Sequence, residues 1–329
     1  PLAHPPSVQM MSGAACFAGF RFLDNGCSWY ETNHLEGCLR LSSPRPQCSA
    51  AADTNTQRHL RQAEGQSTPE HTLAVLMPYR GAGRVGDLHS LCSRLPAHLE
   101  AIGVQYRLFL LNQVDALPFN RGALVNAAVR LMGETDGLVL QRSGMPPPVF
   151  DYLAIHDIDR FPVRNGRGGR VACDNATAEY YSFPHPSPRV LHPSSFAGGV
   201  LVLQRAHFEA VNGFSNEYWG WGEEDNDLFL RLRWCGWAPR HGQQLESCME
   251  HRDCRLCARQ KRAVDPRRLQ LHRERVGAQL ARPSRHMDAA FDGLHTANFT
   301  ALRRTTRRCG VGESVHVIDV ALERADEIV

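Results

Sequence analysis

The sequence predicts an α/β fold that contains parallel strands and forms one large domain. Two observations carry this prediction. From residue 72 onward, short apolar runs alternate with segments of helical spacing, and a pair of aspartates directly follows one of the apolar runs. The composition agrees, because 329 residues with 43% hydrophobic and 22% charged side chains can bury a sizeable core.

The elements are predicted in chain order from these patterns. A strand over 72–77, a helix over 85–102 and a strand over 106–111 form an opening β-α-β unit. The other predicted elements are a helix over 120–132, strands over 152–155 and 199–203, helices over 205–211 and 223–234, and a late strand over 315–320.

A small cysteine-rich segment is predicted at residues 1–48. Four cysteines recur there at intervals of ten or eleven residues, namely Cys16, Cys27, Cys38 and Cys48. This spacing favours a disulfide-stapled unit, with three pairings left open. Residues 49–70 are polar and have no apolar period, so we interpret them as a linker that leads into the main domain over 71–329.

The cysteine content predicts an oxidising compartment. The chain has 11 cysteines and two glycosylation sequons, at Asn175 and Asn298, which fit a lumenal or secreted protein. No apolar stretch approaches the length of a membrane span, so we expect any anchor to lie outside this chain. The net charge of only +3 argues against nucleic acid as a partner.

Asp157 and Asp159 form an Asp-x-Asp pair at the end of a predicted buried strand. Ligands of α/β proteins bind at the carboxyl ends of parallel strands. Carboxylate oxygens at this spacing suit Mg²⁺ or Mn²⁺ together with a diphosphate. Most Asp-x-Asp pairs are solvated turns, so the position at a strand end is what favours a metal site.

The run from Trp219 to Asp227 combines two tryptophans, two glycines and several acids. Acids at the start of a helix are favoured by the helix dipole, which explains part of the pattern. Two tryptophans separated by glycine are costly to expose and suit stacking on a sugar ring. This run therefore predicts a mobile sugar-binding loop.

The segment 248–257 has residues that could bind zinc, since Cys248, His251, Cys254 and Cys257 are spaced by three. Such tight spacing fits one tetrahedral ion poorly, so disulfides or free thiols are the favoured interpretation.

The overlapping run 252–285 has ten arginines and one lysine against three acids. It is interpreted as a solvated helix face, with a landing strip for an anionic glycan or a membrane surface as the alternative.

Taken together, the motifs resemble the β-1,4-galactosyltransferases of glycosyltransferase family 7, and most closely the xylosylprotein branch that builds the glycosaminoglycan linker. The segments that carry the resemblance are 75–80, 111–115, 119–126, 156–159, 198–200, 212–216, 219–227 and 292–294. The resemblance implies a GT-A type, Rossmann-like nucleotide-sugar transferase domain. The signature Asn112 to Asp115 is closer to the linker enzyme than to members that act on N-acetylglucosamine.

The resemblance also implies roles for individual residues. The uridine diphosphate site would be lined by Pro78, Tyr79, Arg80, Phe119, Arg121 and Asp157. The metal, Mn²⁺, would be held by Asp159, His251 and Met249. In the catalytic group, Trp221 would close over the substrates, Glu224 would contact the acceptor, and Asp225 would be the base.

Two departures from the family pattern stand out. Asn226 occupies a position where the family has an aspartate that helps to hold the acceptor sugar. Residues 164–177 look inserted and carry a sequon, which predicts an exposed loop.

The implied function is a metal-dependent, inverting transfer of galactose from UDP-galactose to a β-xyloside or related glycan, in the Golgi lumen. Three alternatives stay open: a UDP-N-acetylgalactosamine donor, an N-acetylglucosamine acceptor, and a sugar-binding protein without catalysis.

Overall fold

The computed structural model describes residues 72–132, 150–162, 170–181, 185, 187–190, 197–241, 248–251, 266–280, 292–310 and 312–324. The predicted cysteine-rich segment and the predicted linker lie outside these residues. No helix in the described part of the chain has the length and apolar character that a membrane span requires.

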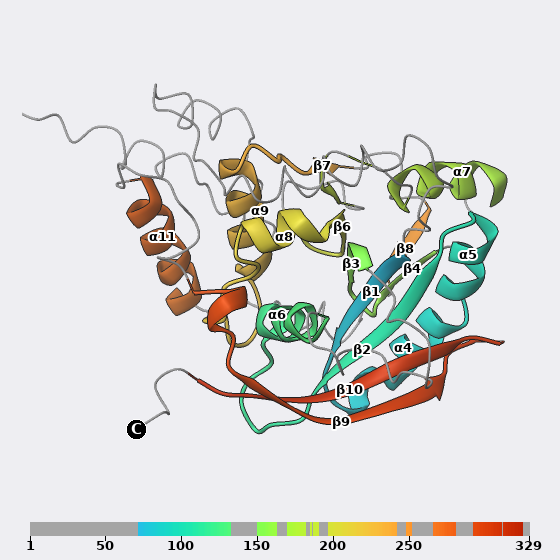
Figure 1. The fold of residues 1–329 in the computed structure, drawn as a ribbon, viewed down its shortest axis with the longest axis horizontal. Helices are drawn as coiled ribbons and strands as arrows, with labels where there is room; N and C mark the ends of the chain where they lie inside the picture. The colour runs from blue at the N-terminus through green and yellow to red at the C-terminus, as the bar shows by residue number, and fades with distance from the viewer. Residues whose placement is uncertain are drawn as a thin grey trace, which may run out of the picture.

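One eight-stranded sheet forms the centre of the described fold (Figure 1). In spatial order its strands are β7 (Arg240–His241), β5 (Arg189–Val190), β6 (Val200–Gln204), β3 (Phe150–His156), β1 (Thr72–Tyr79), β2 (Tyr106–Gln113), β10 (Ser314–Leu322) and β9 (Phe299–Arg308). The four strands β3, β1, β2 and β10 are parallel, whereas β6 and β9 flank them as antiparallel neighbours. The predicted α/β class is confirmed, with a parallel centre inside a mixed sheet.

Helices cover both faces of this sheet and bury two apolar clusters. On one face lie α6 (Arg121–Leu131), α8 (Arg205–Ala210) and α9 (Glu224–Trp234), packed on the side chains of one parity along each strand. On the other face lie α4 (Val85–Cys92), α5 (Leu95–Ala101) and α7 (Arg170–Tyr181). The central strands are buried on both faces, which explains their nearly continuous apolar runs.

The single helix predicted over 85–102 is wrong, because the chain forms two helices there. It breaks at Ser93 and Arg94, and Pro96 lies in the first turn of α5. Proline lacks the N–H that a helix interior needs but is tolerated in a first turn. The first helix therefore ends before Pro96, and a new helix begins at Leu95.

The predicted exposed loop over 164–177 is also wrong in its second half. Residues from Arg170 onward form α7, and the side chains of Cys173, Thr177 and Tyr181 are buried. Polar and small residues dominate this segment, so its sequence gives no clear helical pattern. The sequon residue Asn175 is nevertheless exposed on this helix.

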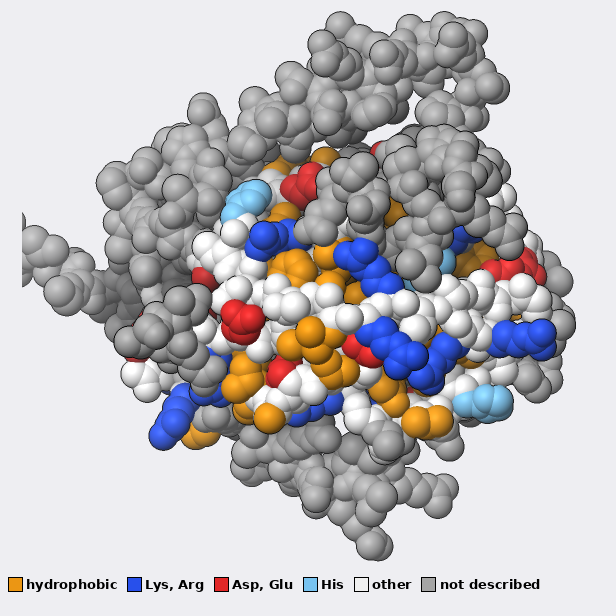
Figure 2. Space-filling view, turned by 60° about the horizontal axis from the view of Figure 1, so that its bottom comes forward, with side chains coloured by type: hydrophobic (Ala, Val, Ile, Leu, Met, Phe, Trp, Pro, Cys, Tyr) orange, Lys and Arg blue, Asp and Glu red, His pale blue; other side chains and the backbone are white. Residues whose placement is uncertain are grey.

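Disulfides join segments that are distant in the sequence. Cys92 is bonded to Cys309, Cys173 is bonded to Cys248, and Cys235 is also disulfide-bonded. The zinc alternative is excluded for Cys248, because its sulfur is bonded to another sulfur. On the face that Figure 2 shows, basic side chains of the described residues lie in several separate groups, with acidic and apolar side chains between them.

Candidate active site

Several of the predicted site residues follow the carboxyl ends of the parallel strands. β1 ends at Tyr79 and β3 ends at His156, and the two strands are hydrogen-bonded neighbours. Asp157 and Asp159 follow β3 directly. Parallel strands end at the same edge of a sheet, so Pro78 and Tyr79 lie on the same sheet edge as the Asp-x-Asp pair.

Arg121, the first residue of α6, forms the electrostatic centre of this edge. Its Nε lies 2.9 Å from Oδ1 of Asp157. Its two terminal nitrogens are buried without a hydrogen-bond partner among the described residues. Buried polar atoms almost always have partners, so this guanidinium has spare donors that suit an anionic ligand.

A network of hydrogen bonds holds the loop that contains Phe119 in place. Arg80 donates through Nη2 to the carbonyl of Asp115, at 3.1 Å. Gln113 donates to Oδ1 of Asp115, at 2.8 Å, and accepts the backbone N–H of Asn120, at 2.9 Å. The signature from Asn112 to Asp115 therefore shapes the loop before α6, and Arg80 supports this loop.

The two asparagine-containing motifs are locked together beneath the site. Asn126 donates to the carbonyl of Phe214, at 2.8 Å, and accepts the backbone N–H of the same residue, at 3.0 Å. Gly213, the residue before Phe214, has a φ of +61°, and a Cβ at this position would lie 2.4 Å from Oδ1 of Asn126. Only glycine combines this conformation with this close approach.

The tryptophan run forms an open loop that ends at the start of α9. The side chain of Trp219 is partly buried against the core, whereas Trp221 is 50% exposed. Gly220 donates its N–H to the carbonyl of Phe119, at 2.7 Å. Glu223 adopts a left-handed conformation with φ of +71°, which is uncommon for a residue with a side chain.

Glu224 and Asp225 are partly buried at the start of α9. Burial raises the pKa of Glu224, while Arg121 and Arg268 oppose this rise. Burial and then repulsion by Glu224 raise the pKa of Asp225 to about 8, against a lowering influence of Arg121. A carboxyl group with a pKa near neutrality is suited to general base catalysis.

Asn226 differs from the family pattern and has a local partner. Its Nδ2 donates to Oε2 of Glu223, at 3.0 Å. An aspartate here would face Glu223 with the same charge, so the amide is compatible with the local arrangement of acids.

The buried guanidinium group of Arg231 holds the first turn of α9 in place. Arg231 donates through Nε to Asp227, at 2.7 Å, and through Nη1 to the carbonyl of Asp292, at 3.1 Å. The side chain of Arg231 is only 1% exposed. This network ties α9 to the segment at Asp292 that belongs to the family motif 292–294.

Asp159 lies next to a small second sheet. Its Oδ2 is 2.6 Å from Nη2 of Arg84. The strand β4 (Arg160–Pro162) starts at the next residue and pairs with β8 (Met249–His251), with Arg160 opposite His251. The backbone of the segment 249–251 is thus brought beside the Asp-x-Asp pair.

Met249 is buried in the apolar cluster beneath α4 and α5. Among the residues whose side chains are described, no three His, Cys, Asp or Glu groups form a metal-binding cluster.

Two family models match the chain. The "N-terminal region of glycosyl transferase group 7" matches residues 30–167, and the "N-terminal domain of galactosyltransferase" matches residues 167–247. The chain belongs to glycosyltransferase group 7. The predicted family is therefore confirmed.

Relatives within group 7 carry related names. Beta-1,4-galactosyltransferase 7 of Drosophila melanogaster is 34% identical over 185 residues, which are 54% of this chain and 49% of that protein. Xylosylprotein 4-beta-galactosyltransferase of Caenorhabditis elegans is 31% identical over 168 residues, 50% of this chain and 51% of that protein. The chain spans about half the length of these curated relatives.

Two solved structures of a group 7 protein share the fold. One is a variant of Drosophila β1,4-galactosyltransferase 7 in complex with manganese, UDP-Gal and xylobiose, with 25% identity and a TM-score of 0.56. The other is its catalytic domain in complex with xylobiose, with 26% identity and a TM-score of 0.58. Each match covers 77% of this chain and 95% of the solved chain. The predicted fold is confirmed.

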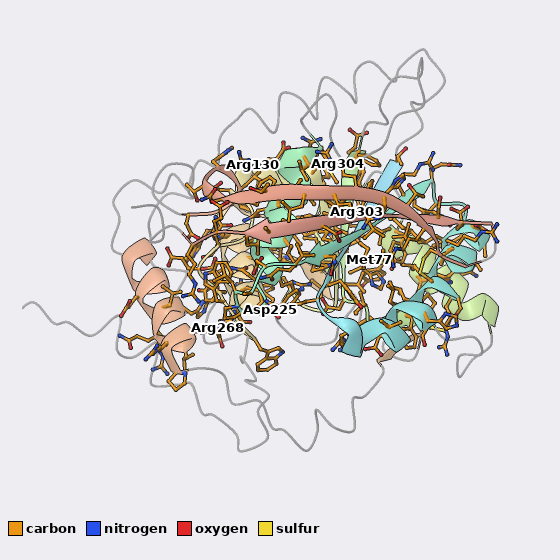
Figure 3. All side chains as sticks on the ribbon, turned by 90° about the horizontal axis from the view of Figure 1, so that it is seen from below. Met77, Arg130, Asp225, Arg268, Arg303 and Arg304 are labelled. Carbon is orange, nitrogen blue, oxygen red and sulfur yellow. A yellow bond between two sulfur atoms is a disulfide. The ribbon has the colours of Figure 1, made fainter. Side chains whose placement is uncertain are left out.

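Two arginines near the site were not predicted from the sequence. Arg84 pairs with Asp159, and no motif marks it. Arg268 of α11 (Pro266–Leu280) lies near Asp225 (Figure 3), 3.6 Å from Glu224 and over the ring of Tyr218. The side chain of Arg268 is buried, so the interpretation of the basic run as a solvated helix face is wrong at this position.

Proposed function

We propose that this chain transfers galactose from UDP-galactose to a β-xyloside, with inversion at the anomeric carbon, to form a β-1,4 linkage. The observation that carries the proposal is the arrangement around Arg121, which is paired with Asp157 and interacts electrostatically with the partly buried acids Glu224 and Asp225. A cation with spare donors beside a carboxyl group of raised pKa suits a diphosphate leaving group and a general base. The names and ligands of the related proteins support the same reaction.

The donor site is proposed at the ends of β1 and β3. The two unpartnered nitrogens of Arg121 donate hydrogen bonds to diphosphate oxygens. The carboxylate of Asp157 accepts hydrogen bonds from hydroxyl groups of the ribose. Pro78, Tyr79 and Phe119 line the nucleotide pocket. Arg80 shapes this pocket through its bonds to the loop carbonyls.

The metal proposed for this site is Mn²⁺, and the residues present fit it. Asp159 offers a carboxylate oxygen beside the strand that contains His251, and oxygen and imidazole ligands suit this ion. When bound, the metal neutralises charge on the leaving diphosphate. Met249 is the third predicted ligand. Its thioether is a soft donor within an apolar cluster, so we propose that Asp159 and His251 provide most of the affinity.

Catalysis is proposed to follow from the position of Asp225. The carboxylate removes the proton from the acceptor hydroxyl while that oxygen forms a bond to the anomeric carbon. The bond from this carbon to the diphosphate oxygen breaks on the opposite side, and its electron pair leaves with UDP. Glu224 contacts the acceptor sugar, and Trp221 closes over both substrates and excludes water, which suppresses hydrolysis of the donor.

The proposal is tested by measuring UDP release and sugar transfer with the purified chain and Mn²⁺. UDP-galactose and UDP-N-acetylgalactosamine are compared as donors, and β-xyloside, β-glucoside and β-N-acetylglucosaminide as acceptors. We expect transfer with UDP-galactose and the xyloside. Strong preference for the N-acetylglucosaminide would contradict the acceptor, and binding of UDP without any transfer or hydrolysis would indicate a sugar-binding protein.

The compartment proposed is the Golgi lumen, where the chain would meet a nucleotide sugar and a glycan acceptor. The disulfides of the described residues support an oxidising compartment.

A further inference from the structure

The strand β8 has little support from hydrogen bonds alone. It comprises three residues, and among the described residues it pairs with the three residues of β4, in a sheet of two strands. Such a short two-stranded ladder has marginal stability in water. The position of β8 therefore depends on what else holds it.

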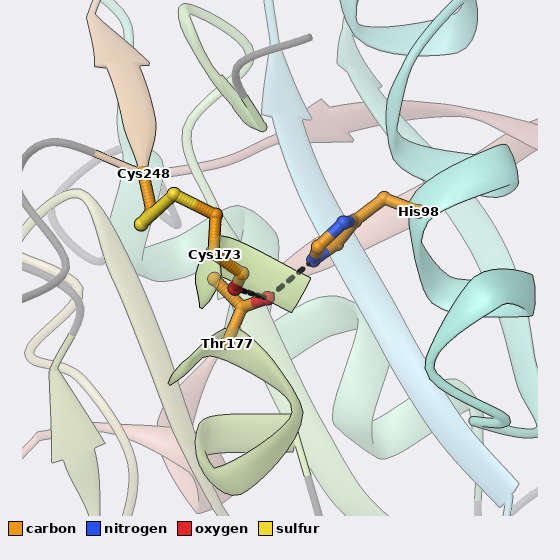
Figure 4. The surroundings of a disulfide bond; sticks show 4 residues. All are labelled: His98, Cys173, Thr177 and Cys248. Atoms are coloured by element: carbon orange, nitrogen blue, oxygen red, sulfur yellow. Dashed lines mark hydrogen bonds between the residues drawn. A yellow bond between two sulfur atoms is a disulfide. The ribbon is translucent and has the colours of Figure 1, made fainter. Parts of the chain in front are cut away.

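A disulfide joins the start of β8 to the body of the protein (Figure 4). Cys248, the residue before β8, is bonded to Cys173 in α7, and both side chains are buried at 6% and 5% exposure. The bond connects positions 75 residues apart. It is thus a covalent link between β8 and a helix packed on the sheet.

The helix α7 is itself fastened to the core next to this disulfide. Thr177 is fully buried, donates to the carbonyl of Cys173, at 2.8 Å, and lies 2.7 Å from Nε2 of His98 on α5. On α5, Leu95 and Leu99 belong to the apolar cluster on this face of the sheet. A continuous series of contacts therefore runs from the core through α5 and α7 to Cys248.

This series of contacts ends beside the proposed metal site. Asp159 is followed by Arg160, which lies opposite His251 in the β4–β8 ladder. A slip of β8 by one residue would turn every side chain of this strand to the other face. The register of β8 thus decides whether His251 lies opposite Arg160, one residue from Asp159.

We propose that the Cys173–Cys248 disulfide is a positioning element of the metal site, which fixes β8 so that His251 is held opposite Arg160 and therefore close to Asp159. The inference rests on the proposed function, since it requires a metal held by these two residues. It also gives a role to two features outside the catalytic assignments, the inserted segment 164–177 and the cysteine at 248.

The test is the double variant Cys173→Ala/Cys248→Val, which opens this disulfide and keeps the buried site apolar. Binding of Mn²⁺ in the presence of UDP is measured directly, from the electron paramagnetic resonance signal of the free ion. We expect the dissociation constant for Mn²⁺ to rise by about tenfold or more, which is the usual effect of losing support for a metal ligand. At saturating Mn²⁺, kcat should return close to the wild-type value.

The control is Cys92→Ala/Cys309→Val, which opens the disulfide at the other described pair. This bond closes a span of 217 residues, so in the chain-entropy model its loss costs at least as much stability. We expect a lower melting temperature in the control and an unchanged dissociation constant for Mn²⁺. For a double variant that does not fold, partial reduction of the native protein replaces it, and the loss of Mn²⁺ binding must follow the released fraction of Cys248 rather than that of Cys309.

Unchanged Mn²⁺ binding after opening Cys173–Cys248 would overturn the inference, as would an equal loss in both double variants. A wild-type chain that does not bind Mn²⁺ in the presence of UDP would overturn the proposed metal site, and the inference with it. The wild-type measurement therefore distinguishes the two failures.

Discussion

Asp225 shows how one residue can be both unfavourable for stability and useful for chemistry. Its side chain is partly buried beside Glu224, and the pKa of its carboxyl group is raised to about 8. A group of this kind gives up its proton reluctantly and takes one readily at neutral pH. Ionisable residues whose surroundings shift their pKa strongly in this way are typical of functional sites.

The role of Asp225 as base is tested by Asp225→Asn. We expect turnover to fall by about 10²- to 10⁴-fold, the usual contribution of a positioned base. Binding of UDP should persist, because Arg121 and Asp159 are unchanged, and calorimetric titration with UDP and Mn²⁺ checks this. Turnover near the wild-type value would remove Asp225 from the role.

We also expect Asp225→Asn to become more stable relative to the wild type as the pH rises. Between about pH 4 and pH 8, the folded chain keeps a proton on Asp225 that the unfolded chain has released, so wild-type stability falls as pH rises through this window. The slope for one proton is at most about 1.4 kcal/mol per pH unit. Asparagine does not titrate, so the melting temperature of Asp225→Asn relative to wild type should increase from pH 5 to pH 8. A difference independent of pH would contradict the raised pKa.

Asp159 is tested against a neighbour with the same arginine partner. Arg84 lies 2.6 Å from Asp159 and 3.0 Å from Asp87, which is in α4. We expect Asp159→Ala to abolish the Mn²⁺-dependent part of UDP binding, because the ion loses its anionic protein ligand. Asp87→Ala disturbs the same arginine and should leave the Mn²⁺ dependence intact. Equal effects of the two variants would refute Asp159 as the ligand.

At the scale of elements, the sequence predicted the parts that are apolar and regular. The strands β1, β2, β3 and β10 are predominantly apolar, and Asn120 caps α6 by accepting the N–H of Ala123 at 2.9 Å. The strand β9 was missed because four of its ten residues are arginines, so it shows no alternation of apolar side chains. The strands β4 and β8 were missed because three residues are too few to produce a pattern.

The lock between α6 and the loop at 212–216 is tested by Gly213→Ala. A methyl group there would meet Asn126 at 2.4 Å and the ring of Phe208 at 2.9 Å. Gly236 is the matched control, since it also has positive φ, at +85°, but a methyl group there would meet no atom of the described residues within 4 Å.

We expect Gly236→Ala to cost about 1–2 kcal/mol of unfolding free energy, for the left-handed conformation alone. Gly213→Ala should cost about 1–3 kcal/mol more, because of overpacking. Urea denaturation of both variants measures the difference. Equal costs would show that the close approach to Asn126 contributes nothing.

At the scale of the whole molecule, contacts between distant segments assemble the site. The sequence marked Asp157, Asp159, Glu224 and Asp225 through their motifs, but it could not mark Arg84 or Arg268. An arginine in a basic run looks the same in sequence whether it is solvated or buried. Arg268 is buried beside Glu224 because α11 packs there, and that packing depends on the tertiary fold.

The two described disulfides have a similar dependence on the tertiary fold. The cysteine count predicted oxidised cysteines, whereas the pairing of Cys92 with Cys309 follows from the neighbouring ends of α4 and β9. The distance between such partners along the chain carries no signal that could identify them.

The central claim is an inverting transfer of galactose to a xyloside, and the product itself tests it most directly. The purified chain is incubated with Mn²⁺, carbon-13-labelled UDP-galactose and a β-xyloside, and the product is examined by nuclear magnetic resonance. We expect a new galactose anomeric signal with the large proton coupling of a β linkage, joined to O4 of the xylose. A product with an α linkage, or no labelled disaccharide while the folded chain binds UDP and Mn²⁺, would contradict it.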